Sequence, residues 1–290
     1  MTNTHTERST SVIRGGTLIG LMHNAFQKQR NLYEHCNRQD AFEVVELMGG
    51  MVKVGVISDG MGSGKNSGVG AGLIANHMAY AVASELVTYV AFDTANEYVP
   101  ESISMFAGKA LSTYLDNLLR LQYGTLSPTL ANTVLSKFVD QYLMATCLIV
   151  CDYQYAGQQV SFVVYRGDGY VITRKGNKIA SHELTIDNDI QGHVYYPAGE
   201  ILKTQQMRPF HVFDTGHTEF DAIAIGSDAW EELPKASRQL FFDGHDDDKE
   251  LIEDVLFFGR NTDLTMMTND DLSVVVVERM NHVVSDDTHN

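Results

Sequence analysis

Five short segments each place an aspartate where an extended, apolar run begins or ends. They are Gln39-Asp40-Ala41, Ser58-Asp59-Gly60, Gly167-Asp168-Gly169, Ser227-Asp228-Ala229 and Asn269-Asp270-Asp271. Carboxylates that converge at one edge of a sheet repel one another unless a cation offsets their charge. Carboxylate and carbonyl oxygens are the ligands that Mg²⁺ and Mn²⁺ prefer, so the five segments indicate a site for divalent cations.

Each segment also has an ordinary structural explanation, because Asp often bonds to nearby backbone N–H groups in turns and at helix starts. Asp168-Gly169 could form only a tight hairpin turn, and Asp228 could cap the helix that follows it. Asp40 could be a strand-edge charge, and Asp270-Asp271 could be a solvated loop. Asp59 is the hardest to explain in this way, because it ends an apolar strand and is followed by a glycine-rich loop and a long helix.

Other motif-based chemistries fit the chain less well. Residues 59–66 (DGMGSGKN) lack the first glycine and the final hydroxyl residue of a phosphate-binding P-loop. Their glycines are spaced by two, which is not the dinucleotide-binding pattern GxGxxG. The chain has no EF-hand pattern for Ca²⁺, and its 11 histidines include no HExxH zinc motif.

Composition restricts the class of protein further. The 290 residues include 21 Lys+Arg and 37 Asp+Glu, and the resulting net charge of −16 argues against nucleic acid and against an anionic membrane surface as partners. No apolar window is long enough for a membrane span, and the polar N-terminus lacks the core of a secretory signal. Cys36, Cys147 and Cys151 form no CxxC motif, which together with the missing signal predicts a cytoplasmic protein.

The periodicity of apolar residues predicts which elements carry these segments. Alternating runs over 42–48 and 51–58 flank Gly49-Gly50 and predict a two-residue β-hairpin. Helical spacing is found over residues 66–90, 98–122 and 128–145, and helical pieces are expected within 235–258. Further strands are predicted over residues 145–151, 159–165, 170–173, 220–226 and 272–279. The segment 174–215 has no clear pattern.

Strands therefore occur in groups separated by groups of helices. This order is typical of an α+β fold with largely antiparallel sheet, not of a regular βαβ alternation. The chain has only five prolines and no linker-like stretch. We therefore expect a single domain over residues 12–282, with flexible tails over 1–11 and 283–290.

The five segments, in this order, resemble the motifs of the metal-dependent protein phosphatase 2C family of Ser/Thr phosphatases, especially its bacterial branch. That family carries a Glu/Gln-Asp-Ala pair, an Asp-Gly-x-Gly strand end, a Gly-Asp-Ser hairpin, a Ser-Asp-Gly strand end and a closing Asp-Asn-x-Thr/Ser strand. The resemblance extends over roughly residues 12–280. It implies a central antiparallel β-sandwich flanked by helices on both sides, in agreement with the α+β class predicted from the periodicity.

The resemblance also implies roles for the aspartates. Asp59 would bridge two Mn²⁺ or Mg²⁺ ions, and the carbonyl of Gly60 would bind one of them. Asp228 and Asp270 would complete the other. Asp40 would hold a metal-bound water.

A third, looser ion would be bound by Asp168 together with Asp228. The segment 174–215 corresponds to a mobile flap beside the site in the family. Many members hold the substrate phosphate with an upstream arginine, and the candidates here are Arg14, Arg30 and Arg38. His23 and His35 are candidates for the proton donor to the leaving group.

Three positions depart from the family pattern. Gln39 replaces Glu, as it does in many bacterial relatives, while Ala229 replaces Gly and Asp271 replaces Asn. Any metal contact of Gln39 would be through a neutral oxygen, which does not inactivate the bacterial relatives. Ala229 and Asp271 do not stand at principal ligand positions, so an active site remains the expectation.

The resemblance implies a metal-dependent phosphatase that hydrolyses phosphoserine and phosphothreonine in proteins by in-line attack of a metal-bridging hydroxide. The substrate would be a phosphorylated protein, with a Ser/Thr kinase as the opposing enzyme. The alternative is a catalytically weak or inactive phosphatase-like scaffold that acts as a regulatory binding module. The presence of Asp59, Asp228 and Asp270 favours the enzyme.

Overall fold

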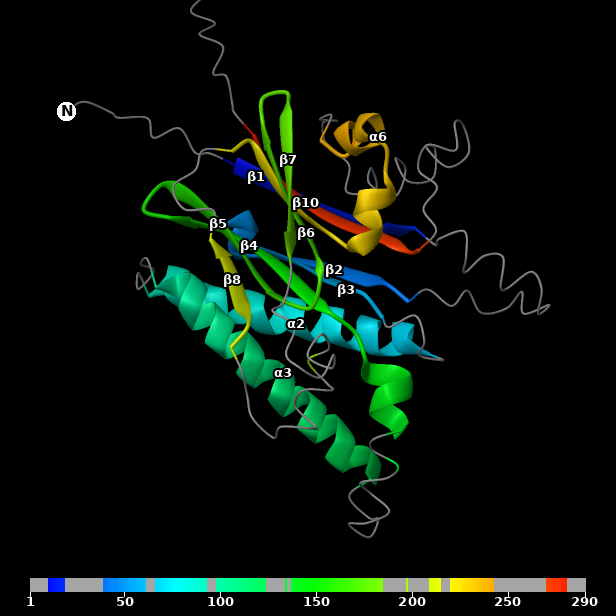
Figure 1. The fold of residues 1–290 in the computed structure, drawn as a ribbon. Helices are drawn as coiled ribbons and strands as arrows, with labels where there is room; N and C mark the ends of the chain where they lie inside the picture. The colour runs from blue at the N-terminus through cyan, green and yellow to red at the C-terminus, as the bar shows by residue number, and fades with distance from the viewer. Residues whose placement is uncertain are drawn as a thin grey trace, which may run out of the picture.

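Two five-stranded antiparallel sheets and the helices that cover them make up the described part of the chain (Figure 1). The computed structural model describes residues 10–18, 39–60, 66–92, 98–123, 134, 137–184, 197, 209–214, 220–242 and 270–280.

The first sheet pairs the first and last described strands of the chain. Its order is β1 (Thr10–Leu18), β10 (Leu272–Met280), β9 (Ala222–Gly226), β6 (Gly169–Lys175) and β7 (Lys178–Leu184). Residues 274–277 of β10 are all valine, a β-branched residue that packs well on the pleated surface of a sheet. Strand β10 therefore lies in the interior of its sheet, between β1 and β9.

The second sheet carries the first of the predicted aspartate segments. Its order is β2 (Ala41–Leu47), β3 (Val52–Ser58), β4 (Cys147–Tyr155), β5 (Gln158–Arg166) and β8 (His211–Asp214). All residues of β3 are buried, because this strand has a neighbour on each side and a layer on each face.

Apolar side chains from the facing sides of the two sheets form an inner core. They include Ile13, Ile57, Leu148, Val150, Val163, Val171, Ile223, Ile225 and Val275. A Cβ atom on Gly55 would lie 2.3 Å from Cγ1 of Val275, so the close approach of the sheets at this point requires a glycine.

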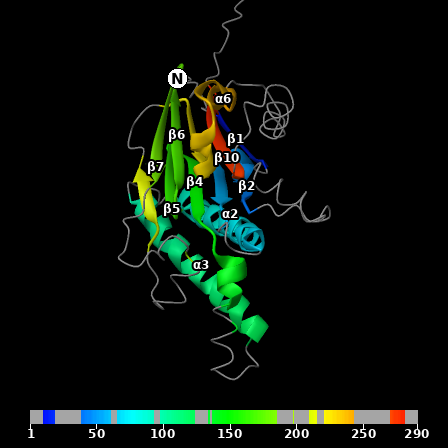
Figure 2. The same cartoon turned by 45° about the vertical axis from the view of Figure 1, so that its right-hand side comes forward.

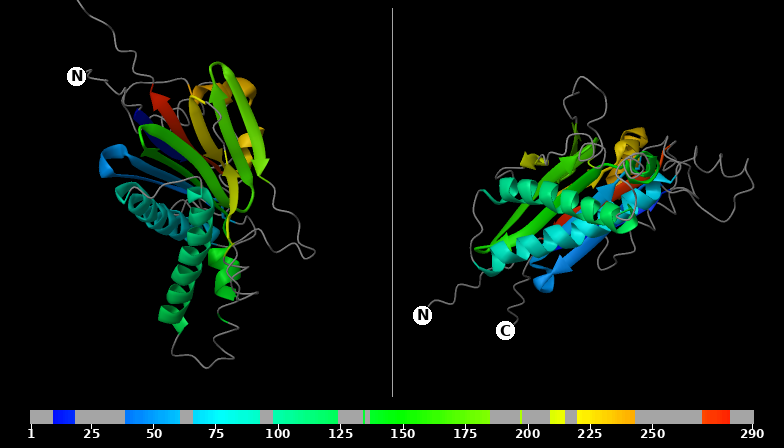
Figure 3. Two further views of the ribbon diagram at one scale, coloured as in Figure 1. Left: turned by 90° about the vertical axis from the view of Figure 1, so that its left-hand side faces the viewer. Right: turned by 90° about the horizontal axis from the view of Figure 1, so that it is seen from below.

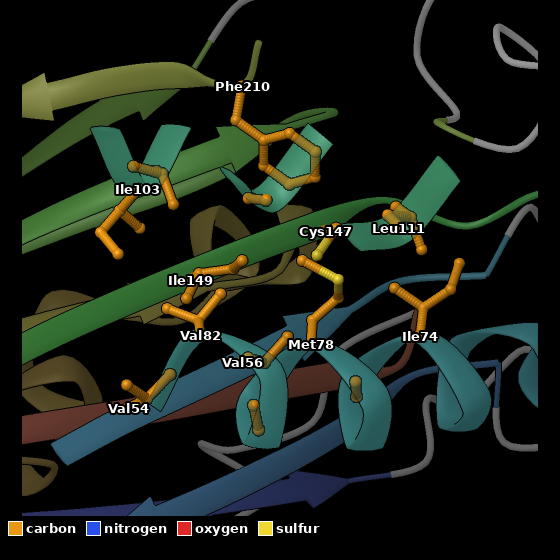
Figure 4. Packing of buried hydrophobic residues seen from close by; sticks show 14 of the residues in the cluster. Val54, Val56, Ile74, Met78, Val82, Ile103, Leu111, Cys147, Ile149 and Phe210 are labelled. Carbon is orange, nitrogen blue, oxygen red and sulfur yellow. The ribbon is translucent and has the colours of Figure 1, made fainter. Parts of the chain in front are cut away.

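Two long helices cover the outer face of the second sheet. Helix α2 (Ser67–Ala91) and helix α3 (Val99–Tyr123) enclose a second core with β3 and β4. Figure 4 shows Met78 and Val82 of α2 beside Val56 of β3 and Cys147 of β4. Fully burying one such apolar side chain contributes about 1.5–3 kcal/mol, so this layer accounts for much of the stability.

The outer face of the first sheet is covered by shorter helices. The 3₁₀-helix η3 (Asp228–Glu232) and helix α6 (Lys235–Leu240) lie here, and Trp230 is fully buried against the sheet. Figures 2 and 3 show α6 on the opposite side of the sandwich from α2 and α3. The predicted α+β fold, an antiparallel sandwich with helices on both sides, is confirmed.

Most predicted elements occur close to their expected bounds. Helices α2 and α3 match the predictions over 66–90 and 98–122. A third helix is predicted over 128–145. Its described residues are helical as far as the end of the π-helix η2 (Val139–Leu143), and residues 128–133 lie outside the described part of the chain. Helix α6 accounts for the beginning of the segment 235–258, and residues 243–258 also lie outside.

The hairpin between β2 and β3 has a longer turn than predicted. Leu47 pairs with Val52, so the turn takes in four residues, and the 3₁₀-helix η1 (Met48–Gly50) lies within it. Met48, Gly49 and Gly50 have φ angles of 54°, 65° and 87°. The left-handed conformation extends back to Met48, which the pattern of two glycines does not reveal.

Strand β1 begins inside the segment that was expected to be a tail. Thr10 pairs with Met280 and Ser11 pairs with Arg279, and Ser11 is buried. The Ser11 hydroxyl donates a hydrogen bond to Oδ2 of Asp152 at 2.5 Å. This long-range hydrogen bond stabilises the buried Ser11. The polar composition of the N-terminal segment does not indicate that Ser11 is buried.

The segment 174–215 contains two edge strands in its described residues. Strand β7 pairs with β6 in the first sheet, and strand β8 pairs with β5 in the second. The rings of His182 and Phe213 lie 5.3 Å apart and link these two edges. No helix among the described residues is long and apolar enough to cross a membrane.

Candidate functional site

Antiparallel pairing brings the aspartate segments together in two pairs. Ala41 of β2 pairs with Ser58 of β3, so Asp40 and Asp59 are neighbours at one end of the second sheet. Strand β10 starts beside the end of β9, so Asp270 lies near Asp228 at one end of the first sheet. The N–H of Gln39 donates to Oδ2 of Asp271, so the two sheet ends lie side by side. The charges of Asp228 and Asp270 both raise the pKa of Asp59.

Asp40 is buried and interacts with both sheets. Its carboxyl group lies beside Asp59 and Ser227, and its Oδ2 atom has no hydrogen-bond partner among the described residues. Burial raises the pKa of Asp40 well above its usual value, and the charge of Asp271 raises it further. A buried carboxylate oxygen without a partner is costly, so this position favours a cation or an ordered water.

Asp59 lies at the centre of the acidic group. Burial raises its pKa well above the usual value, and the charges of Asp40, Asp228 and Asp270 add to the shift. The three neighbours act on one carboxyl group and come from both sheets.

Asp228 belongs to the same group, and its side chain is exposed to solvent. Partial desolvation, followed by the charges of Asp270 and Asp168, raises the pKa of Asp228 to about 6. The residue is the first of the 3₁₀-helix η3, whose N-cap is Ser227, so Asp228 does not cap the helix.

Asp168 lies in a crossover between the two sheets and not in a hairpin turn. Strand β5 belongs to the second sheet and strand β6 to the first, so residues 167–168 carry the chain across the sandwich. Gly167 and Gly169 have φ angles of 115° and 141°, which permit this passage. The reading of Asp168-Gly169 as a tight hairpin is therefore wrong, because the chain changes sheets there. Burial raises the pKa of Asp168.

Gly60 is fixed by its surroundings. Its N–H donates to the carbonyl oxygen of Gln39 at 3.1 Å, and it forms an isolated β-bridge with Ala145. A Cβ atom at this position would lie 2.6 Å from that carbonyl oxygen and 2.9 Å from Ser67. Only glycine fits here, which explains the Asp-Gly pair that the sequence shows. The rest of the glycine-rich loop, residues 61–65, lies outside the described residues.

The start of β10 holds the start of β2. Asp271 is buried, and its Oδ2 accepts a hydrogen bond from the N–H of Gln39 at 2.7 Å. The carbonyl oxygen of Asp271 accepts a hydrogen bond from the hydroxyl of Ser227 at 3.2 Å. Sequence reasoning treats Asp271 only as a tolerated replacement for Asn, and no local signal indicates that its side chain connects the two sheets.

The donor chemistry of this group fits a hard divalent cation. The carboxyl groups of Asp40, Asp59, Asp228 and Asp270 offer only oxygen, which is what Mg²⁺ and Mn²⁺ bind. Among the described residues, no three His, Cys, Asp or Glu side chains lie close enough to hold a metal ion as one group. The mutual repulsion and the unpaired Asp40 oxygen nevertheless indicate an environment that a cation would stabilise.

Of the candidates for the phosphate-binding arginine and the proton-donating histidine, only Arg14 lies within the described residues. Arg14 lies in β1, and its guanidinium group forms an ion pair with Glu278 of β10. Glu278 also pairs with Arg174 at 2.7 Å, so Arg14 belongs to a structural ion-pair network. The remaining candidates lie outside the described residues: Arg30, Arg38, His23 and His35.

A scan against protein families matches residues 29–228 to the family described as protein phosphatase 2C. The match covers more than half of the chain, and the chain belongs to this family. Members of the family generally use Mn²⁺ or Mg²⁺. A search of the curated proteins finds no matching sequence.

Solved structures share the same fold at low sequence identity. A bacterial serine phosphatase with an arginine-to-glutamate substitution superposes with a TM-score of 0.56 at 11% identity, covering 94% of this chain and 100% of its own. The serine/threonine phosphatase Stp1 from Staphylococcus aureus gives 0.52 at 12% identity, covering 97% and 100%. PppA, a key regulatory component of T6SS in Pseudomonas aeruginosa, gives 0.52 at 10% identity, covering 94% and 99%.

Proposed function

We propose that the protein is a metal-dependent phosphatase that hydrolyses phosphoserine and phosphothreonine in proteins. The observation that carries the proposal is the convergence of Asp40, Asp59, Asp228 and Asp270 at one end of the sandwich in a chain of this family. When bound, two divalent ions would activate a water for attack on phosphorus and offset the charge of the phosphoryl group.

The chain's own residues supply position and charge. Asp59, Asp228, Asp270 and the carbonyl of Gly60 would hold the ions, and Asp168 would add a weaker ligand beside Asp228. Asp40 would accept a hydrogen bond from a water through the oxygen that lacks a partner. The hydrogen bonds from Gln39 to Asp271 and from Gly60 to Gln39 keep these groups in place before substrate binds.

The direct test is metal-dependent release of phosphate from a phosphothreonine peptide. The wild-type protein should be inactive in excess EDTA and active after Mn²⁺ or Mg²⁺ is added. Asp59→Asn should reduce turnover by at least about 100-fold, because a central ligand loses its charge. The exposed carboxylate of Glu46 provides a control, and Glu46→Gln should keep wild-type turnover.

Two results would contradict the proposal: hydrolysis that persists in EDTA, or full activity of Asp59→Asn. A wild-type protein that binds Mn²⁺ in calorimetry but releases no phosphate would instead support the alternative function, a phosphatase-like scaffold.

A further inference from the structure

Thr146 lies directly before β4, at the end of the second sheet that carries Asp59. It follows Ala145, which forms the β-bridge with Gly60, and it precedes Cys147, the first residue of the strand. The residue is only 2% exposed. Neither its type nor its spacing sets it apart in the sequence.

The hydroxyl and backbone of Thr146 hold the main chain of Asp59 on both sides. The N–H of Asp59 donates to Oγ1 of Thr146 at 2.9 Å, and the N–H of Thr146 donates to the carbonyl oxygen of Asp59 at 2.8 Å. The hydroxyl of Ser58 donates to the carbonyl oxygen of Thr146 at 2.6 Å. Only the first of these bonds depends on the Thr146 side chain.

The methyl side of Thr146 faces the crossover that carries Asp168. A Cβ atom on Gly167 would lie 2.5 Å from Cβ of Thr146 and 2.6 Å from its Cγ2. The crossover backbone thus packs directly on the threonine. One side chain therefore contacts the segments of two acidic residues that are far apart in the sequence.

We propose that Thr146 is a positioning residue that fixes the Asp59 main chain relative to the Asp168 crossover. The proposal rests on the proposed function only in treating Asp59 as a metal ligand. Without the hydroxyl, the part-buried Asp59 N–H has no acceptor, and its desolvation cost favours a displaced backbone. A displaced backbone moves both the Asp59 carboxylate and the Gly60 carbonyl, so metal binding should weaken.

Two substitutions separate the hydroxyl from the methyl group. Thr146→Val keeps the shape and the contact with Gly167 but removes the acceptor. Thr146→Ser keeps the acceptor and removes the methyl group. A control with similar burial is Ser161→Ala on β5, which removes a hydrogen bond to Asp152 away from the carboxylates.

The first readout is amide hydrogen exchange at Asp59 in the metal-free protein. Thr146→Val should exchange faster at this amide by about tenfold, while Thr146→Ser and Ser161→Ala should resemble wild type. The second readout is the dissociation constant for Mn²⁺ measured by calorimetry. Thr146→Val should bind Mn²⁺ about 10- to 100-fold more weakly, as is usual when a group that orients a ligand is lost, and Thr146→Ser should restore most of the affinity.

The proposal is overturned if folded Thr146→Val shows wild-type exchange at Asp59. It is also overturned if Thr146→Val binds Mn²⁺ as tightly as wild type, or if Ser161→Ala weakens binding equally. If the wild-type protein binds no Mn²⁺, the proposed function fails, and the exchange measurement alone then decides the role of Thr146.

Discussion

At the scale of single residues, the ionised carboxylates of the candidate site destabilise the folded protein. Asp40, Asp59 and Asp228 all have raised pKa values, because burial and neighbouring carboxylates disfavour their charged forms. Asp271, which accepts a hydrogen bond from the N–H of Gln39, is another buried carboxyl group next to them. Such a concentration of unfavourable charge away from the main ion-pair networks is characteristic of functional sites.

The first residue-scale prediction concerns Asp228→Asn in EDTA. The pKa of Asp228 is about 6 when folded and about 4 when unfolded. Ionisation therefore opposes folding, with the full cost present above pH 6 and relieved as the pH falls below it. Asp228→Asn should raise the melting temperature of the metal-free protein by only about 2 °C at pH 7.5, because solvent screens this exposed side chain, and should have little effect at pH 4.5.

Saturating Mn²⁺ should reverse the order of the two proteins at pH 7.5, because the wild type binds the ion more tightly. Glu46→Gln removes an exposed carboxylate and should leave the melting temperature unchanged. A metal-free Asp228→Asn protein that melts below wild type at pH 7.5 would show that Asp228 stabilises the fold.

At the scale of elements, the passage from β5 to β6 determines how the acidic groups meet. This passage joins the two sheets, and its φ angles of 115° and 141° at Gly167 and Gly169 are unfavourable for any other residue. A hairpin would have kept Asp168 within one sheet. The crossover instead places its charge close enough to raise the pKa of Asp228.

Two glycine substitutions test this constraint. Gly167→Ala should destabilise the protein by about 1–3 kcal/mol, because its Cβ meets Thr146 and its φ is positive. Gly72→Ala, in the interior of α2 with open space around the new Cβ, should stabilise it by about 0.5–1 kcal/mol. Urea denaturation measures both changes, and equal midpoints for the two variants would exclude a strained crossover.

At the scale of the whole molecule, a buried polar network fastens the two sheets together away from the carboxylates. Asp152 is fully buried and accepts hydrogen bonds from Ser11, Gln159 and Ser161. Arg279 donates to the carbonyl oxygen of Gln159 at 3.2 Å. Burial lowers the pKa of Arg279, and the charge of Asp152 offsets part of that shift. The network thus connects β1 and β10 of one sheet to β4 and β5 of the other.

Removing the central carboxylate should weaken the whole sandwich. Asp152→Ala should lower the free energy of unfolding by about 1–3 kcal/mol, because it leaves the donors of Ser11, Gln159 and Ser161 without their acceptor. Asp152→Asn keeps an acceptor oxygen and should cost clearly less. Urea denaturation gives the free energies, and Mn²⁺ affinity of the folded variants should match wild type. Equal stability of Asp152→Ala and wild type would contradict a structural role for the network.

The sequence by itself determined the fold class, the main elements and the candidate carboxylates. Alternation and helical spacing are local properties, so they predicted α2, α3, β3, β9 and β10 close to their observed bounds. The family motifs then gave the order of the aspartates. These signals can be read from the sequence because each lies within a few consecutive residues.

Only the tertiary structure decided which groups hold the site together. The hydrogen bonds from Asp59 to Thr146 and from Gln39 to Asp271 join residues 87 and 232 positions apart. The assignment of β5 and β6 to different sheets likewise depends on long-range pairing. A threonine or a second aspartate looks ordinary in the sequence, because its role comes from the buried N–H group that the folded chain brings to it.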